Sequence, residues 1–394
     1  MRNKKRLSAM LTAAVVLTAS AVSMSGSAVT TVRDPDGDGR ILVSDGSFIL
    51  QYLVGGFNPT SQKSLDFDGN GIISKKDATV LSHYWMQLIN GSSLDGINLP
   101  APVGADTQAV ATTREYVRHY YSSSDPTSYS EYSLTVDPYN NTNTSPNANS
   151  QQRVVIGDND MQLDPDTAVI QLQFSGGTGS AFIVDDHLIA TAAHCVCKDQ
   201  NFFNMKIKLK DSNNNVKWIT PKYIDANKNF YDNYNSNGNP NTSDYNTYLL
   251  GNDYALIYVE EDLSNYGIFN MGVALNEYAD NHGEVIVSGF PSKSAYPSWF
   301  EATIEKTRFK AKGKILSRTP KYINYDADTA PGDSGGPVYV QEEFSGDTYN
   351  TVIAINVAET YNSKDPNNDS VKKNHGVRIT PDILNFFYNN PNIE

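Results

Sequence analysis

The sequence predicts an all-β domain of two small barrels over residues 154–394, preceded by a small α-helical unit over residues 33–92. Three observations support this fold class. From residue 154 onward, short apolar runs are separated by turn residues, a pattern typical of barrels and sandwiches. Residues 33–92 contain two Asp-rich loops, each followed by a short helical pattern. Residues 93–153, which separate the helical unit from the β region, show neither of these patterns over most of their length.

Composition limits the function classes that are open to the chain. A length of 394 residues allows two or three domains, and 39% hydrophobic residues can fill at least one sizeable core. The formal net charge of −13 argues against nucleic acid and against an anionic membrane as partners. Two cysteines cannot form a disulfide framework.

Residues 1–28 have the composition of an export signal. Four basic residues lie within residues 2–6, an apolar run covers residues 9–22, and Gly26 and Ala28 supply the small residues of a cleavage site. The apolar run is shorter than the ~20 residues that a spanning helix needs. The sequence therefore predicts a secreted, extracellular protein without a membrane partner.

The two Asp-rich loops begin at Asp34 and Asp66, 32 positions apart. In both loops, oxygen-bearing side chains stand at positions 1, 3, 5 and 12, and glycine stands at position 6. This is the spacing of a calcium loop of the EF-hand type, with aspartate in place of the usual glutamate at position 12. One such loop is often an ordinary acidic turn, whereas two copies that each lead into a helix favour calcium binding.

This duplicated loop–helix unit resembles the dockerin modules of cellulosomal proteins over about residues 33–92. The resemblance implies two bound calcium ions and docking onto a cohesin of a scaffolding protein. The calcium ligands that it implies, with Arg40 and Ile72 acting through their carbonyls, are Asp34, Asp36, Asp38, Arg40 and Asp45, then Asp66, Asp68, Asn70, Ile72, Ser74 and Asp77. Leu42 stands at position 9 of the first loop, so water or backbone has to serve there. Positions 10 and 11 differ between the copies (Val43-Ser44 and Lys75-Lys76), which argues against two-way symmetric docking.

Residues 93–153 are expected to be a linker and pro-segment. Ser, Asn, Thr, Tyr, Pro and Asp dominate from residue 122 to residue 152. Such a composition buries too little apolar surface to offset the entropy of ordering. We expect a disordered spacer, with a short helix around residues 113–121 as its one regular element.

Strands are expected in two sets, followed by a closing helix. The first set covers residues 168–174, 181–184, 188–190, 205–209 and 254–259; the second covers residues 284–287, 301–309, 314–316, 322–325, 338–340, 352–357 and 376–379. The helix is expected at residues 381–388, with proline in its first turn. The Asn-rich residues 211–246 are expected to be a loop insertion.

Three motifs in the β region carry side chains suited to acyl transfer. Ser334 stands in Gly-Asp-Ser-Gly-Gly before an apolar strand, where the N–H groups of Gly332 and Ser334 can converge on an oxyanion. A serine hydroxyl needs a base and the base an orienting group; His194 and Asp253 are candidates for these roles. Each motif alone has a plainer explanation, as a turn or a packed side chain. Their occurrence together in the order His, Asp, Ser, each beside a predicted strand, favours catalysis.

This set resembles the trypsin-like serine proteases, which implies His194 as base, Asp253 as its orienting group and Ser334 as nucleophile. Within that group, residues 154–160 resemble the mature start of bacterial glutamyl endopeptidases, and Thr329 matches a threonine that lines their S1 pocket. The resemblance covers about residues 153–390. It implies maturation after Arg153 and recognition of a substrate carboxylate by the Val154 amine.

The P1 preference stays open between acidic and basic side chains. Asn356 stands where the glutamyl branch has a pocket histidine, and an amide carries no charge. Asp328 lies six residues before Ser334, where trypsin has the acid that binds Lys or Arg. The glutamyl branch also has an Asp-Thr pair there, which leaves a structural role for Asp328 open. The Val154 amine can pair with Asp333 or enter the pocket, but cannot do both.

Two further residue types have structural interpretations. His375 precedes Gly376 on a strand that could edge the S1 pocket, but a position on the surface is expected. Cys195 and Cys197 are expected to be free thiols, because a bridge between residues two apart would be strained.

The sequence therefore predicts a secreted serine endopeptidase with Ser334, His194 and Asp253 as its triad and with a possible preference for Glu or Asp at P1. A dockerin would tether it to a cellulosome scaffold, and its partners would be a protein or peptide substrate and a cohesin. The alternative is a non-catalytic cellulosomal adaptor whose protease-like domain only binds protein. The intact triad argues against that alternative.

Overall fold

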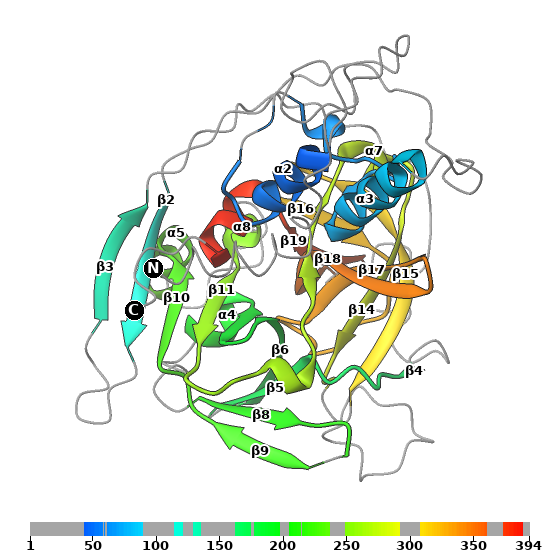
Figure 1. Ribbon diagram of the computed structural model, residues 1–394. Helices are drawn as coiled ribbons and strands as arrows, with labels where there is room; N and C mark the ends of the chain where they lie inside the picture. Colours follow the sequence, from blue (N-terminus) through cyan, green and yellow to red (C-terminus); the bar gives the residue numbers. More distant parts are fainter. Residues whose placement is uncertain are drawn as a thin grey trace.

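The computed structural model describes residues 43–57, 59, 61–89, 114–120, 129–134, 162–174, 177–197, 205–213, 215–236, 249–291, 308–360 and 373–388. Two large, mostly antiparallel β-sheets dominate these ranges, and two helices from the N-terminal part lie beside the second sheet (Figure 1). The all-β prediction for the C-terminal region is confirmed. No helix in the described ranges is long and apolar enough to cross a bilayer.

The first sheet has nine strands in the order β3-β2-β10-β11-β7-β6-β5-β8-β9. Their bounds are β2 Arg114–Tyr120, β3 Tyr129–Leu134, β5 Val169–Phe174, β6 Gly177–Asp185, β7 Leu188–Thr191, β8 Lys206–Lys210, β9 Val216–Ile219, β10 Tyr223–Asn227 and β11 Ala255–Tyr258. Among the described strands, no pairing joins the two edges of this sheet. It is a half-barrel that carries an extra hairpin at one edge.

The second sheet closes on itself. Its strands are β4 Gln162–Leu163, β12 Asn270–Met271, β14 Glu284–Gly289, β15 Phe309–Arg318, β16 Tyr322–Tyr325, β17 Pro337–Phe344, β18 Asp347–Thr360 and β19 Lys373–Arg378. The path β18-β17-β14-β15-β16-β19 returns to its start because β19 also pairs with β18. This closed barrel is the second of the two predicted barrels.

The helices connect and cover the sheets. They are α2 Val43–Leu53, α3 Lys75–Ile89, α4 Ala193–Cys197, α5 Lys228–Ser236, α7 Asn276–Asp280 and α8 Pro381–Tyr388, with short 3₁₀ turns η2 Gln62–Ser64, η5 Leu250–Asn252 and η6 Ser264–Tyr266. The predicted closing helix agrees with α8 at both ends. Proline is tolerated at its start because the first N–H groups of a helix have no intrahelical partner.

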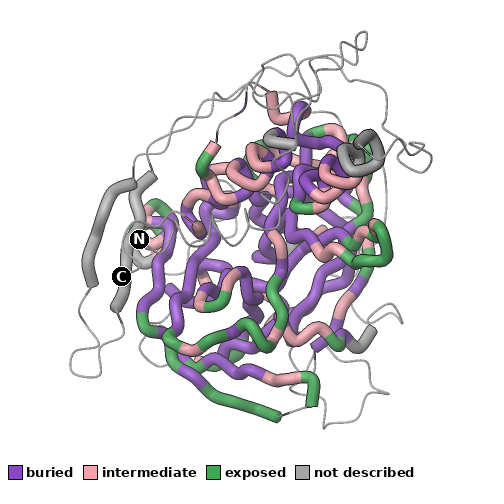
Figure 2. The backbone as a smooth tube through the Cα atoms, in the orientation of Figure 1, coloured by how far each residue is buried: buried purple, intermediate pink, exposed green. Residues whose placement is uncertain are grey.

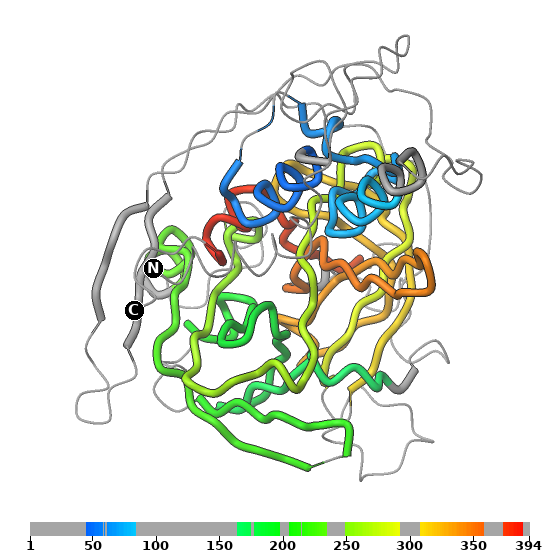
Figure 3. Tube along the Cα trace, viewed as in Figure 1, coloured from blue at the N-terminus to red at the C-terminus, as the bar shows by residue number. Residues whose placement is uncertain are grey.

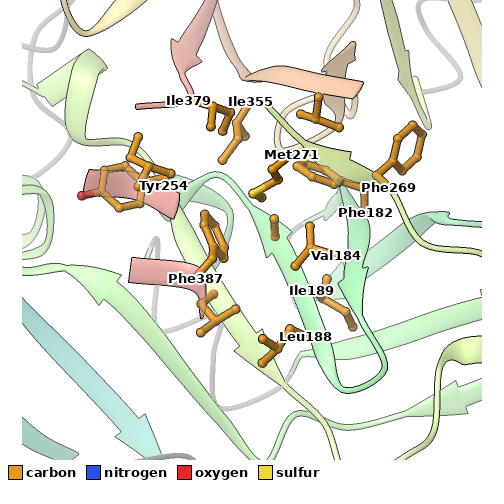
Figure 4. Close-up of a cluster of buried hydrophobic side chains, with 14 of the residues drawn as sticks. Phe182, Val184, Leu188, Ile189, Tyr254, Phe269, Met271, Ile355, Ile379 and Phe387 are labelled. Atoms are coloured by element: carbon orange, nitrogen blue, oxygen red, sulfur yellow. The ribbon is translucent and has the colours of Figure 1, made fainter. Parts of the chain in front are cut away.

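The two sheets share a core with α8. Figure 4 shows Phe182 and Leu188 from the first sheet facing Ile355 from the second and Phe387 from α8. All four side chains are fully buried. Burying one such side chain stabilises a fold by about 1.5–3 kcal/mol. Most residues near the centre of the view in Figure 2 are buried, and a long exposed stretch runs along strand β9 at the bottom.

The N-terminal helical unit is joined to this core. Figure 3 shows α2 and α3 against the strands and the closing helix of the C-terminal region. Ile49, Leu65 and Leu81 belong to the same buried cluster as Leu256 and Ile355. A short strand, β1 Ile72–Ile73, pairs with β13 Val273–Ala274 of the C-terminal region.

Two expectations from the sequence are wrong. The Asn-rich stretch is not only a loop: it contains β9, β10 and α5, and β10 is an inner strand whose five residues are all buried. Residues 114–120 form strand β2 where a helix was expected, and β2 with β3 forms a hairpin in the predicted spacer. In both cases pairing with the sheet overrides a polar composition. Expected strand residues 301–307 lie outside the described ranges.

Candidate active site and acidic loop

His194 and Asp253 form a close pair at one end of the first sheet. His194 lies in α4, directly after β7, and Asp253 lies between η5 and β11. The Nδ1 atom of His194 is 2.7 Å from Oδ2 of Asp253, and the His194 backbone N–H donates to Oδ1 at 2.8 Å. Both carboxylate oxygens of the fully buried Asp253 therefore bind His194, one at the ring and the other at the backbone N–H. This arrangement fixes the ring and leaves Nε2 available to accept a proton.

The environment of His194 sets its proton affinity. Burial disfavours the charged imidazole, but the adjacent Asp253 carboxylate outweighs this effect and raises the pKa of His194 well above its ordinary value. The side chain keeps 21% of its surface exposed. A base with this environment holds a proton strongly once it has received one.

Ser334 lies in a glycine-rich turn between the two sheets. Gly332 and Gly335 have φ values of 104° and 87°, in the left-handed region that favours glycine. A Cβ on Gly335 would lie 2.2 Å from Ser180 O and from Thr191 Oγ1, so the turn packs directly on β6 and β7. The Ser180 N–H donates to the Ser334 carbonyl at 2.8 Å.

Cys195 connects the turn to the histidine. Its sulfur is 3.4 Å from the Ser334 carbonyl oxygen and 3.6 Å from Nε2 of His194. The structure therefore brings all three predicted triad residues to one place, two from the first sheet and one from the second.

Ser180 is a site residue that the sequence analysis did not identify. Its fully buried hydroxyl donates to the Gly332 carbonyl at 2.8 Å and accepts from the Phe290 N–H at 2.8 Å. It therefore anchors the turn of the nucleophile to the first sheet. The available signal was weak: Ser180 is one of two hydroxyl side chains, with Thr178, in the strand of residues 177–185.

Asp333 is a buried acid with an unused oxygen. It is 3% exposed; Oδ2 accepts from the Ala330 N–H at 2.9 Å, while buried Oδ1 has no hydrogen-bond partner. Burial raises the pKa of Asp333 to about 8, against the opposing effect of the Ala330 N–H. A buried acceptor of this kind is costly unless a donor or a positive charge reaches it. Val154, the predicted source of an amine, lies outside the described residues.

The predicted pocket residues are buried around the same turn. Thr329 and Asp328 are 5% and 8% exposed. In Asn356, Oδ1 accepts from the Tyr325 hydroxyl at 2.6 Å, and Nδ2 donates to the Asp333 carbonyl at 3.0 Å. The Asn356 amide is thus mainly bound within the protein and has one N–H left for a ligand.

His375 is buried, so the expectation of a surface position is wrong. It lies on β19, is 4% exposed, and its ring is 6.0 Å from that of Tyr322 in an edge-on contact. Burial, with a smaller effect of Lys373, lowers the pKa of His375 to about 4. It is therefore a neutral side chain at neutral pH.

Neither cysteine forms a disulfide, as the sequence predicted, and both are buried. Burial raises the pKa of the Cys197 thiol well above its ordinary value, which keeps it protonated and unreactive.

The second acidic loop gathers three carboxylates. Ligand atoms of Asp66, Asp68 and Asp77 lie within 4.8 Å of one another. Asp77 is fully buried and accepts from the N–H groups of Asp68 at 3.1 Å and Ser74 at 2.8 Å. Asp66 is 9% exposed; its Oδ2 accepts from the Gly71 N–H at 2.9 Å, but its buried Oδ1 has no hydrogen-bond partner.

These residues fit a hard divalent cation. Burial and the neighbouring Asp68 charge raise the pKa of Asp66 to about 7, and burial with the other two acids raises that of Asp77. Converging carboxylates with an unpartnered oxygen are the donor set that calcium prefers. The Asn70 Oδ1 atom accepts from the Ile72 N–H at 2.7 Å, and Ser74 Oγ accepts from the Lys76 N–H at 3.2 Å.

The first acidic loop is described only at its end. Asp45 lies in the first turn of α2 and is 1% exposed. The other predicted ligands of that loop, Asp34, Asp36, Asp38 and Arg40, lie outside the described residues.

The fold and the cluster of His194, Asp253 and Ser334 agree with the sequence-based expectation of a serine peptidase of the trypsin type. Residues 179–344, from β6 to β17, match the family described as the trypsin-like peptidase domain, and the match contains all three triad residues. The chain is also similar to a solved structure described as a Glu endopeptidase in complex with MPD. That similarity has 16% sequence identity and a TM-score of 0.41, and covers 59% of this chain and 97% of the other. At this level it carries no weight in the assignment.

Proposed function

We propose that the chain is a secreted endopeptidase in which Ser334 attacks the scissile carbonyl of a protein or peptide substrate. The observation that carries this proposal is the His194–Asp253 pair set against the turn of Ser334. His194 Nε2 takes the hydroxyl proton and returns it to the leaving amine, while Asp253 stabilises the imidazolium. The N–H groups of Gly332 and Ser334 bind the oxyanion. Water then releases the acyl group by the same steps.

Labelling with a fluorophosphonate tests this mechanism, because the reagent needs an activated serine hydroxyl. We expect stoichiometric labelling of Ser334 in the processed chain and none in Ser334→Ala. A folded, processed chain that resists the reagent and cleaves no peptide would favour the binding-adaptor alternative.

For specificity, we propose a preference for an acidic P1 side chain, with Thr329 and the remaining Asn356 N–H as donors to its carboxylate. Both residues lie beside the turn of the nucleophile. A peptide library that varies P1 among Glu, Asp, Gln, Lys and Arg tests this preference. Dominant cleavage after Lys or Arg would assign the pocket to Asp328 instead, and would leave the serine peptidase proposal intact.

We further propose that cleavage after Arg153 activates the precursor by freeing the Val154 amine. The unpartnered Oδ1 of buried Asp333 supports this residue as the partner of the amine, because an ammonium would satisfy the orphan acceptor. A form extended by one residue before Val154 should then lose activity on all substrates by a similar factor. If the extension instead abolishes only the preference for Glu over Gln, the amine belongs in the pocket.

Residues 33–92 are proposed to bind two calcium ions and to dock onto a cohesin, with residues 1–28 directing export. The acidic loop at residues 66–77 supports the calcium part, since three carboxylates converge there around an unpartnered oxygen. Calorimetry on the secreted chain should detect two ions, and chelator should prevent capture by a cohesin. N-terminal sequencing of protein from the culture medium checks both cleavage sites.

A further inference from the structure

The acidic loop at residues 66–77 is built into the edge of the peptidase region. Its strand β1 pairs with β13, and the Leu275 N–H donates to the Gly71 carbonyl at 2.7 Å. Gly71 has a φ of 87°, and a Cβ there would lie 2.9 Å from Cβ of Tyr278. A Cβ on Gly272 would lie 2.7 Å from the Ile73 carbonyl oxygen. Glycine on both sides permits this close backbone approach.

One carboxylate from the peptidase region reaches into the surroundings of the loop. Glu342, near the end of β17, accepts from Nδ2 of Asn70 at 2.5 Å and from Nζ of Lys76 at 2.8 Å. The same two donors also contact Oδ2 of Asp68, Asn70 at 3.0 Å and Lys76 at 2.9 Å. Asp68 in the loop and Glu342 in the sheet therefore share both donors. We call these four residues the latch.

The latch is largely shielded from water. The side chains of Lys76, Asp68 and Glu342 are 13%, 14% and 12% exposed. Charges so placed interact more strongly than an exposed surface pair does. The Oε2 atom of Glu342 is buried and has no hydrogen-bond partner, so this carboxylate has unused capacity to accept. Asn70 and Glu342 also line a cavity of about 590 Å³.

A cation in the loop changes how Lys76 is shared. A divalent ion bound by Asp66, Asp68 and Asp77 neutralises Asp68 and repels the Lys76 ammonium. The Lys76 ammonium then pairs with Glu342 alone, and Glu342 lies on β17 of the second sheet. Ion binding therefore strengthens the contact between the loop and the peptidase sheet. By thermodynamic reciprocity, Glu342 strengthens ion binding to the same extent.

We propose that the latch makes cation binding and the attachment of residues 61–83 to the second sheet a single coupled equilibrium, with Glu342 as a positioning residue for the cation loop. This inference rests on the proposed calcium loop. It adds that the peptidase region completes this loop, so that calcium stabilises the whole chain and not only a tethered module.

The test uses the full chain in a Ser334→Ala background, which prevents self-digestion, with Asp34→Ala to silence the first loop. Calcium calorimetry and thermal unfolding are compared for Glu342→Gln, Lys76→Met and the double variant. Glu342→Gln should weaken calcium binding by about 5- to 10-fold. Lys76→Met removes the competing ammonium and should tighten binding roughly threefold to tenfold. In the Lys76→Met background, Glu342→Gln should change affinity by less than about twofold.

Glu343→Gln is the matched control. It makes the same change of charge one residue along β17, but Glu343 is exposed and accepts from the Thr348 hydroxyl instead. It should leave calcium affinity unchanged. Circular dichroism of each variant confirms folding, and Lys76→Met keeps the test decisive if Glu342→Gln fails to fold.

The outcomes separate the two proposals. If the parent chain takes up no calcium, the calcium loop itself is refuted. If calcium binds equally well to the parent and to Glu342→Gln, and does not raise the midpoint of the main unfolding transition, the latch is refuted while the loop stands. If Glu342→Gln lowers calcium affinity equally in the presence of Lys76 and in the Lys76→Met background, the latch is also refuted. The loss would then come from the change in overall negative charge and not from the sharing of Lys76.

Discussion

Replacing Gly179 by cysteine is expected to cross-link β6 to α4 through a disulfide with Cys195. A Cβ on residue 179 would lie 3.1 Å from the Cys195 sulfur and 3.6 Å from the Cys195 Cβ. A disulfide separates its Cβ atoms by about 3.5–4.5 Å, and its S–S bond of about 2.05 Å puts each Cβ roughly 3 Å from the partner sulfur. Both positions therefore suit the bond with little movement of the backbone.

The ring closed by this bond covers residues 179–195, all of which the structure describes. For a loop of about 15 residues, the chain-entropy model gives about 3 kcal/mol of stabilisation. For a domain of about 150–250 residues, 1 kcal/mol shifts the unfolding midpoint by about 2–4 °C. The midpoint of the peptidase transition should therefore rise by about 6–12 °C.

This shift is measured by thermal unfolding of Gly179→Cys in the Ser334→Ala background, compared with Ser334→Ala alone, with and without reductant. Reductant should remove it, and Gly179→Ser, which adds a side chain of similar size without a bond, should not show it. Thiol counting should find one free cysteine, Cys197, in the oxidised variant. Three free thiols after oxidation, or a midpoint that ignores reductant, would refute the placement of β6 beside α4.

Three further predictions concern the catalytic cluster. Ser334→Ala should lower kcat by about 10⁶ with an unchanged circular dichroism spectrum; substantial remaining activity in pure protein would contradict the assigned nucleophile. Asp253→Asn should lower kcat by about 10⁴. Because the Asp253 charge raises the pKa of His194 and only the neutral base accepts a proton, the variant should move the acidic limb of the kcat/KM profile to lower pH; an unmoved limb would speak against the pair. The pKa of Asp333 is about 8 in the folded state, above its unfolded value. Its contribution to the free energy of unfolding is therefore fully present below about pH 4 and is lost as the pH rises to about 8. Denaturant titrations of the unprocessed chain should show this decline, and Asp333→Asn should flatten it; parallel curves for the two proteins would count against it.

The sequence predicted an element correctly where neighbouring residues alone determine its structure. Apolar runs bounded by turns placed most strands, and proline before an apolar helical pattern placed α8 at both ends. The order of His194, Asp253 and Ser334 indicated the catalytic cluster. Residues 223–227 were missed because Asn-rich neighbours hide a strand whose burial comes from pairing with β11. Ser180 and Glu342 were missed because their partners lie more than 100 positions away along the chain.

The hairpin of β2 and β3 limits what the proposed maturation cut could release. Both strands precede Arg153 in sequence, yet β2 is hydrogen-bonded to β10 inside the first sheet, with Val117 opposite Ala226. The acidic loop, also upstream, pairs through β1 with β13. The proposed cut after Arg153 would therefore leave two chains held together by backbone hydrogen bonds. The N-terminal fragment would stay on the peptidase as a non-covalent subunit, and a partner captured by that fragment would retain the active enzyme after the peptide bond is gone.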